Sequence, residues 1–336
     1  MKNLIIPEHY RSSLDLRKTA FAIKTVKDLF QTELARALHL TRVSAPLFVS
    51  ADSGLNDNLN GVERPVRFDL KEMPGEEVEI VHSLAKWKRY ALKRYGFSAG
   101  EGLYTDMNAI RRDETADNIH SIYVDQWDWE KIIDQKDRNL DFLKETVRTI
   151  YAVLKKAEND ICATFGLHDR FLPAEITFLT SQELEDQYPA LTSKEREYEA
   201  VKKYGAVFVI GIGKKLNSGK PHDGRAPDYD DWDLNGDIIV YYPVLDIPLE
   251  LSSMGIRVSE ESLKRQLDLA GCPERAELPF QKALLSGQLP YTIGGGIGQS
   301  RICMFLLRKA HIGEVHCSIW PDDMVKACQE AGIRLL

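Results

Sequence analysis

The segment TIGGGIGQSRICMFLL, residues 292–307, carries four glycines in five positions and then one arginine where an apolar helix should begin. Glycine lets the backbone come close to another group, and a helix N-terminus favours anions. The segment therefore predicts either a nucleotide-binding loop or a tight turn between a packed strand and helix. A Walker loop is excluded because the segment has no lysine, and the dinucleotide pattern fails because Arg301 stands at or beyond its last glycine position. The single arginine favours the nucleotide interpretation.

The composition is that of an ordinary globular protein, with 336 residues, 43% hydrophobic residues and 28% charged residues. A net charge of -7 without a basic block argues against binding a nucleic-acid polymer. No segment has the apolar length of a membrane span, and the N-terminus lacks a cleavage-site pattern. We expect a cytoplasmic protein with one catalytic domain, residues 1–336, and no membrane partner.

The five cysteines are scattered and never form a CxxC pair, and the eight histidines show neither HExxH nor a knuckle spacing. A zinc site or a catalytic cysteine would need such a pattern. We expect reduced structural thiols.

Hydrophobic periodicity predicts several elements. The expected helices are 15–40, 84–96, 139–166 and 259–271, and the expected strands are 42–50, 66–70, 77–81, 120–130, 205–213 and 237–244. In the strand expected at 120–130, every second side chain points to the same face, and the later ones on this face are polar. This face is therefore either solvated or lines a cleft. Its residues are His120, Ile122, Val124, Gln126, Asp128 and Glu130.

The segment APDYDDWDLNGD, residues 226–237, contains five aspartates and raises the question of a cation site. An EF-hand is rejected because Tyr242 stands where the loop needs glutamate. A magnesium site shared with phosphate oxygens and a solvated acidic loop both remain open. A second glycine-lysine cluster, 211–220, is expected to be a solvated loop, with a lid over a phosphate as the weaker alternative.

Arg111 and Arg112 stand side by side, so in a strand only one of them can face a cleft. Separated arginines, dispersed carboxylates and a glycine segment without a Walker lysine together suit ATP binding outside the P-loop families.

Six strings in order along the chain allow a closer identification: HSLAKWKR, FSAGEGLYT, IYVDQWDWE, RAPDYDDW, ELSSMGIR and TIGGGIGQSR. They resemble the AMP-forming, ammonia-dependent asparagine synthetase (aspartate–ammonia ligase) family, which is similar to the catalytic domain of class II aminoacyl-tRNA synthetases. The resemblance implies an α+β fold, an antiparallel sheet flanked by helices, and a homodimer. Element alternation alone would favour a parallel sheet.

The resemblance also implies the reaction. Aspartate attacks the α-phosphate of ATP, pyrophosphate leaves, and ammonia then displaces AMP from a β-aspartyl adenylate to give asparagine. The expected small-molecule partners are aspartate, ammonia and ATP, with Mg²⁺ as cofactor.

The family's site residues carry over position by position. Arg111 is similar to the arginine that holds the α-phosphate and the reacting carboxylate, with Arg112 as the alternative. Arg301 corresponds to the arginine stacked on adenine, and Gly296 and Gly298 lie in the same ATP-binding segment.

Asp237 and Glu250 match the family carboxylates that hold magnesium, and we expect both at strand ends. The aspartate pocket is implied to contain Asp57, Ser83, Lys88, Gln126, Asp230, Ser252, Ser253 and Arg257. Lys88 or Arg257 would pair a substrate carboxylate, and Asp230 with Gln126 would hold the amino group. Asp57 either accepts a proton from ammonium or only positions the amide.

Three alternatives compete with this function. An aspartyl-tRNA synthetase-like paralogue would form aspartyl adenylate for another acceptor, and a non-enzymatic regulator would keep only the fold. Glutamine-dependent synthesis would need an N-terminal cysteine nucleophile, whereas residue 2 is Lys2.

Overall fold

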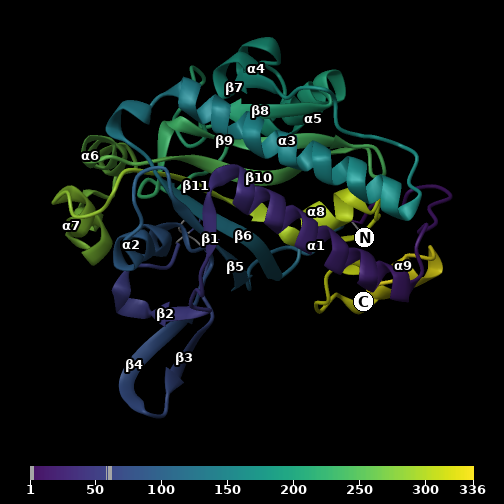
Figure 1. The fold of residues 1–336 in the computed structure, drawn as a ribbon, viewed down its shortest axis with the longest axis horizontal. Helices are drawn as coiled ribbons and strands as arrows, with labels where there is room; N and C mark the ends of the chain where they lie inside the picture. The colour runs from purple at the N-terminus through teal and green to yellow at the C-terminus, as the bar shows by residue number, and fades with distance from the viewer. Residues whose placement is uncertain (1–3, 58, 60–62) are drawn as a thin grey trace.

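A large mixed sheet organises the chain (Figure 1). The computed structural model describes residues 4–57, 59 and 63–336. Within these residues, eight strands form the main sheet in the order β1-β5-β6-β11-β10-β9-β8-β7. Their bounds are β1 Leu40–Arg42, β5 Gly102–Ile110, β6 Tyr123–Ile132, β7 Thr177–Thr180, β8 Ala206–Ile210, β9 Asp230–Tyr242, β10 Ile247–Arg257 and β11 Thr292–Gly298.

The strands from β5 to β8 pair antiparallel through the middle of the sheet. Only the outer pairs, β1 with β5 and β7 with β8, are parallel. The predicted antiparallel sheet flanked by helices is therefore confirmed, with one parallel strand added at each edge. The parallel sheet that element alternation favours is wrong, because most neighbours in the sheet run in opposite directions.

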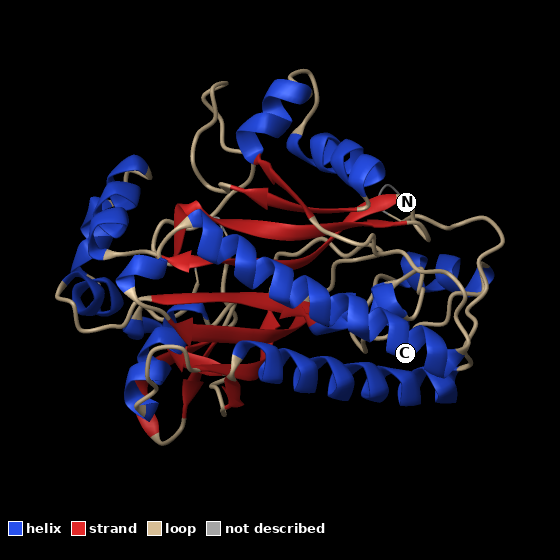
Figure 2. Cartoon of the chain, turned by 45° about the horizontal axis from the view of Figure 1, so that its top comes forward, coloured by secondary structure: helices blue, strands red, loops and turns tan. Residues whose placement is uncertain are grey.

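Two long helices cross one face of the sheet (Figure 2). They are α1, Leu16–Leu38, and α3, Leu140–Phe165. Asp15 and Asn139 cap their first turns through side-chain oxygens, and Gly166 ends α3 in a left-handed conformation. Phe30 of α1 stacks on Trp127 of β6, with the ring centroids 4.7 Å apart. This packing buries one face of the sheet and leaves the opposite face for other groups.

The shorter helices are α2 Ala85–Tyr95, α4 Ser181–Gln187, α5 Ser193–Tyr204, α6 Glu260–Leu269, α7 Pro279–Leu285, α8 Gln299–Leu306 and α9 Asp322–Glu330. Of these helices, α8 packs between the sheet and the two long helices, and α5 packs against β8, β9 and β10 (Figure 1). The predicted Ser259 cap of α6 is present, and its side chain accepts from the Ser262 N–H. Among the described residues, no helix is long and apolar enough to cross a membrane.

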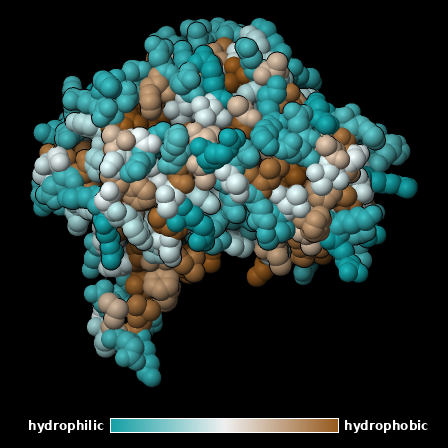
Figure 3. Space-filling model, viewed as in Figure 1, coloured by the Kyte–Doolittle hydropathy of each residue, from teal (hydrophilic) through white to brown (hydrophobic). Residues whose placement is uncertain are grey.

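A small antiparallel sheet projects from the main body (Figure 1). Its order is β2-β4-β3, with β2 at Phe48–Ser50, β3 at Arg67–Leu70 and β4 at Met73–Ile80. Apolar side chains gather on this projection (Figure 3), where Phe48 and Met73 are each more than one-third exposed. The continuous strand expected at 42–50 is wrong, because residues 43–47 separate β1 from β2.

The glycine segment forms neither the loop nor the turn allowed by the sequence. Its glycines lie inside β11, between β6 and β10. A Cβ on Gly294 would lie 2.0 Å from Oε2 of Glu130, and one on Gly295 would lie 2.5 Å from Cβ of Met254. A Cβ on Gly296 would lie 2.6 Å from the Gln126 side chain. The glycines are needed because large side chains of both neighbouring strands lie across β11.

Replacing Gly294 by alanine should lower the free energy of unfolding by about 1–3 kcal/mol, because the new methyl group overlaps the buried Glu130 carboxylate. Urea denaturation would measure the change. Gly298→Ala is the matched control on the same strand, since its Cβ would meet nothing closer than 3.4 Å and its φ is -65°. Equal stability of the two variants would contradict this explanation of the glycines.

Candidate active site

A cavity of about 460 Å³ opens on the face of the sheet opposite α1 and α3. Alternation along β6 separates the two faces. Trp127 and Trp129 are fully buried in the core with α1 and α3, whereas Gln126 and Asp128 line the cavity. Of the two interpretations of this strand, the cleft is correct and the solvated face is wrong.

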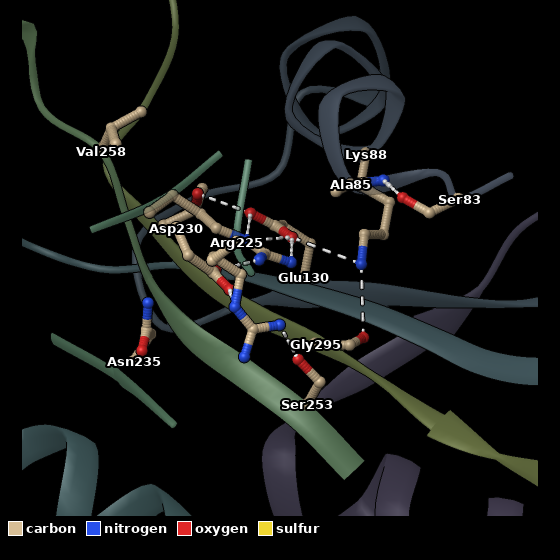
Figure 4. A network of polar contacts seen from close by, with 12 residues as sticks. Ser83, Ala85, Lys88, Glu130, Arg225, Asp230, Asn235, Ser253, Val258 and Gly295 are labelled. Carbon is tan, nitrogen blue, oxygen red and sulfur yellow. Dashed lines mark hydrogen bonds and ion pairs between the residues drawn. The ribbon is translucent and has the colours of Figure 1, made fainter. Parts of the chain in front are cut away.

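A fully buried ion network forms one wall of the cavity, centred on Glu130 of β6 (Figure 4). The Arg257 guanidinium donates to both Glu130 oxygens over 2.9 to 3.1 Å and also pairs with Asp230. Lys88 pairs with Asp128, lies 3.6 Å from Glu130, and donates to the Trp129 carbonyl at 2.9 Å. The network sets two cations against three carboxylates.

Charge within the network determines its protonation. Burial acts to raise the pKa of Glu130, but the positive charges of Arg257 and Lys88 outweigh it and hold that pKa below its usual range. Burial likewise acts to lower the pKa of Arg257, and Glu130 with Asp230 reverses the shift. Both groups are therefore ionised at neutral pH. Lys88 and Arg257, expected to pair a substrate carboxylate, already have carboxylate partners within the protein.

Asp57 is buried and also lines the cavity. Its Oδ1 accepts from the Leu59 N–H at 2.9 Å. Burial raises the pKa of Asp57, the Lys86 charge opposes the rise, and Asp228 reinforces it. Lys86 and Asp228 are themselves an ion pair at 3.5 Å. A carboxylate with a raised pKa is a stronger proton acceptor than an ordinary one.

Arg111 follows the end of β5 and lines the cavity beside Gln126. Its Nη2 donates to the His82 carbonyl at 3.4 Å, while its buried Nε has no partner among the described residues. Arg112 is exposed and is not part of the cavity lining. Arg111, rather than its neighbour, can thus contact a ligand.

Arg301 and Glu250 line the cavity together, and Asp237 lies close to Glu250 without lining the cavity. Arg301 lies in the first turn of α8, and its Nη1 donates to the Glu250 carbonyl at 3.0 Å. Burial raises the pKa of Asp237 to about 6; Arg225 opposes this rise and Glu250 adds to it. Burial also acts to raise the pKa of Glu250, but Arg301 and Lys194 bring it below its usual value.

The carboxylates of Asp237 and Glu250 can be compared with the ligands that a metal ion requires. Among the residues that the structure describes, no group of three or more His, Cys, Asp and Glu side chains could hold an ion. Asp237 and Glu250 alone provide two carboxylates from neighbouring strands, and magnesium commonly takes one or two carboxylates and completes its shell with phosphate and water. Both residues lie within β9 and β10, so their expected position at strand ends is wrong.

Most of the predicted site residues meet in this one cavity. Those that line it are Asp57, Ser83, Lys88, Arg111, Gln126, Asp230, Glu250, Ser253, Arg257, Gly296, Gly298 and Arg301. Ser252 and Asp237 are not part of the lining. The Ser252 hydroxyl is buried without a hydrogen-bond partner among the described residues, and Asp237 contacts the cavity through Arg225.

The acidic segment differs from the solvated loop that was one expectation. Asp228, Asp230 and Asp231 are at most 4% exposed, and β9 begins at Asp230. Cationic partners explain how the aspartates tolerate burial: Arg138 pairs with Asp231 at 2.9 Å, Arg257 pairs with Asp230, and Lys86 pairs with Asp228.

Sequence reasoning missed several polar residues of the lining. Asp128 belongs to the alternating row of β6 whose face was predicted to line a cleft, but the family resemblance did not mark it as a site residue. Arg225 opens the string RAPDYDDW, and Lys194 lies in the first turn of α5. Neither position follows a period, so only the quoted string could have drawn attention to Arg225.

Comparison with known proteins decides the family. The sequence pattern of the family "Aspartate-ammonia ligase" matches residues 17–332. The chain belongs to this family. A Clostridium perfringens protein named aspartate–ammonia ligase is 66% identical over 336 residues, and a Ruminiclostridium cellulolyticum protein of the same name is 62% identical over 336 residues. Both alignments cover 100% of each chain. The predicted family and the ligase class are confirmed.

Solved structures confirm the predicted class II synthetase-like fold. Asparaginyl-tRNA synthetase from Entamoeba histolytica, in complex with asparaginyl-adenylate, superposes with a TM-score of 0.65 at 12% identity, covering 90% of this chain and 69% of the synthetase. The Pyrococcus horikoshii enzyme, with the same adenylate, gives 0.65 at 14% identity and covers 90% and 70%. At these identities the likeness establishes the fold alone.

Replacing Glu130 by glutamine should lower the free energy of unfolding by about 3 kcal/mol, because the buried charges of Lys88 and Arg257 lose their shared counter-ion. Urea denaturation at neutral pH measures this loss. Glu77→Gln is the control, because Glu77 pairs with Arg67 where both side chains are more than half exposed, and should change stability by less than about 1 kcal/mol. A Glu130→Gln protein as stable as the control would show that the network is not needed for folding.

Proposed function

We propose that the chain makes asparagine from aspartate, ammonia and ATP through a β-aspartyl adenylate, with release of pyrophosphate and AMP. Family membership over nearly the whole chain supports this reaction. The single observation that carries the proposal at the site is one cavity lined by Arg111, Arg301 and Asp57, on a fold whose solved neighbours hold an amino-acid adenylate.

The chemistry explains why such a cavity needs cations rather than a nucleophilic side chain. A carboxylate is a poor acyl donor until one of its oxygens becomes a good leaving group. The aspartate β-carboxylate oxygen forms a bond to the α-phosphorus while the bond to the pyrophosphate oxygen breaks. Catalysis of this transfer rests on positioning and charge stabilisation.

The roles of the arginines follow from their places. Arg111 would hold the α-phosphate and the reacting carboxylate together, since its Nε has no protein partner among the described residues. Arg301 would lie on the adenine, because a planar guanidinium can stack and donate at once. Gly296 and Gly298 line the cavity and would let ATP approach β11.

Asp237 and Glu250 would hold Mg²⁺ against the phosphates of ATP. The ion would neutralise phosphate charge there. The two carboxylates raise the electrostatic cost of one another's ionisation, and a divalent cation relieves that cost.

The aspartate pocket would be formed by Ser252 and by the predicted pocket residues that line the cavity, which are Asp57, Ser83, Lys88, Gln126, Asp230, Ser253 and Arg257. Gln126 and Asp230 would hold the amino group, with Ser83 and Ser253 beside it, while Lys88 and Arg257 would offer the substrate's carboxylate a cation that is already paired within the wall of the pocket. We further propose a homodimer in the cytoplasm, acting as a single catalytic domain, residues 1–336.

Asp57 would act in the second step, in which ammonia attacks the adenylate. Ammonium carries a proton that must leave before the nitrogen can attack the adenylate. Asp57 is buried, lines the cavity and has a raised pKa, so it can attract the cation and accept this proton. If Asp57 only positions the amide, its replacement should instead impair adenylate formation and the ammonia step equally.

Transfer of the adenylate to another acceptor is not favoured, because the full-length relatives carry the ligase name. Incubation with ATP, Mg²⁺, aspartate and ammonium should yield AMP, pyrophosphate and asparagine in equal amounts. Formation of ADP, or of AMP without asparagine, would refute the proposal. Aspartate charging of tRNA in the same preparation would support the paralogue instead.

Arg111→Ala should lower aspartate-dependent ATP–pyrophosphate exchange by at least about 100-fold, because a preorganised donor to the reacting centre is lost. Arg112→Ala is the matched control, since it removes the same charge one residue away on an exposed side chain. Loss of exchange in the Arg112 variant with retention in the Arg111 variant would reverse the assignment.

Asp57→Asn should lower asparagine formation by about 100-fold while changing pyrophosphate exchange much less, because only the second step needs the proton acceptor. Stopped-flow or quench measurements on preformed adenylate would isolate that step. The exposed Asp69→Asn serves as control. Equal loss of both steps would assign Asp57 to substrate positioning.

A further inference from the structure

Arg225 is a buried cation that the assigned roles leave unused. It lies in the loop before β9 and lines the cavity with a side chain only 9% exposed. Its Nη2 donates to Asp237 at 2.6 Å and its Nη1 donates to the Ser253 hydroxyl. Nε lies 3.6 Å from Asp230 and has no hydrogen-bond partner among the described residues. Figure 4 shows the guanidinium between Asp230 and Ser253.

The loop is shaped to hold this side chain in place. Gly213 has a φ of +103°, and a Cβ there would lie 2.9 Å from Cβ of Arg225 and 2.5 Å from Nε1 of Trp232. Only glycine permits this approach. Buried His222 anchors the same loop, with its Nε2 3.0 Å from Oε1 of Glu197 on α5. A loop fixed on both sides presents Arg225 at a defined position.

Arg225 differs from the other buried cations of the cavity in its capacity for a new partner. Lys88 donates to Asp128 and to two backbone carbonyls, and Arg257 is held by Glu130 and Asp230. The Nε–H of Arg225 is buried and makes no hydrogen bond among the described residues, because the Asp230 oxygen is 3.6 Å away, so an anion in the cavity could accept from it and offset its desolvation.

The sheet order places Arg225 across the cavity from Arg111. Arg111 follows β5 and Arg225 precedes β9, with β6, β11 and β10 between these strands. Arg225 also bridges Asp230 of the proposed aspartate pocket and Asp237 of the proposed metal site. The proposed reaction joins its two substrates at this boundary.

We propose that Arg225 is a second substrate-binding arginine, which donates to an anionic oxygen of the reacting pair from the side opposite Arg111. This inference rests on the proposed function. As the aspartate oxygen bonds to the α-phosphorus and the electron pair of the broken bond leaves with pyrophosphate, charge spreads over the remaining phosphate oxygens. A rigid guanidinium at that position stabilises this charge without reorganising.

Arg225→Gln tests the proposal, with Arg225→Lys as the conservative variant. The glutamine variant should lose about 100-fold in aspartate-dependent pyrophosphate exchange, and lysine should recover part of the loss because it restores the charge but not the two-pronged geometry. A higher KM for aspartate alone would identify a carboxylate oxygen as the ligand. A higher KM for ATP alone, or a loss in kcat, would identify a phosphate oxygen.

Arg196→Gln is the matched control for burial and pairing. Arg196 is 10% exposed and pairs with Glu185 at 3.4 Å, but is not part of the cavity lining. Thermal unfolding of each variant reports the purely structural cost. If Arg225→Gln loses no more exchange activity than Arg196→Gln at matched stability, Arg225 is only a counter-ion of Asp237 and the proposal is overturned.

A direct binding measurement separates this inference from the proposed function. Calorimetric titration of wild type and Arg225→Gln with aspartate, and with a non-hydrolysable ATP analogue and magnesium, does not depend on turnover. Weaker binding of either ligand by Arg225→Gln would uphold the arginine's role even if wild type made no asparagine. Unchanged binding of both together with unchanged exchange would reject it.

Discussion

The structure depends on how one buried carboxylate is neutralised. Glu130 has no exposed surface, yet its side chain stays ionised between Arg257 and Lys88 and accepts from the Thr292 hydroxyl at 2.7 Å. Removing a carboxylate from water is costly unless cations and donors surround it. Those partners come from α2, β10 and β11, so satisfying one charge fixes the mutual positions of three elements.

The two faces of β6 show how the fold separates structure from chemistry. Trp127 and Trp129 bury large apolar rings against the helices, while Gln126 and Asp128 present polar groups to the cavity. The same strand therefore belongs to the core and to the site. Because packing against α1 and α3 fixes the position of β6, the polar groups on its other face are preorganised.

Some of this arrangement could be predicted from the sequence, and the limits are physical. The spacing of Val26, Phe30 and Leu34 marks α1, and Gly166 marks the end of α3, because these signals are local. The glycines of β11 could not be placed correctly, since the side chains that require them lie far away in the sequence; Glu130, which requires Gly294, is more than 160 positions earlier. Long-range packing leaves no period in the sequence.

The site shows the same division. The family resemblance identified Arg111, Arg301 and the aspartate pocket, and the structure brings most of those side chains into one cavity. The strings could not reveal that Asp237 and Glu250 lie in mid-strand, or that Arg225 bridges two parts of the cavity. Such relations arise from strand register and loop closure, which depend on residues distant in sequence.

The position of β11 has a consequence for the order of assembly. Although it comes last among the strands in sequence, β11 pairs between β6 and β10 in the middle of the sheet. During synthesis β6 and β10 lack the strand that lies between them until residues 292–298 emerge. Pairing across such separations is slow and leaves strand edges open to wrong partners. Because β11 joins the two halves of the sheet and lines the cavity, the cavity wall cannot be completed before this last strand has been made.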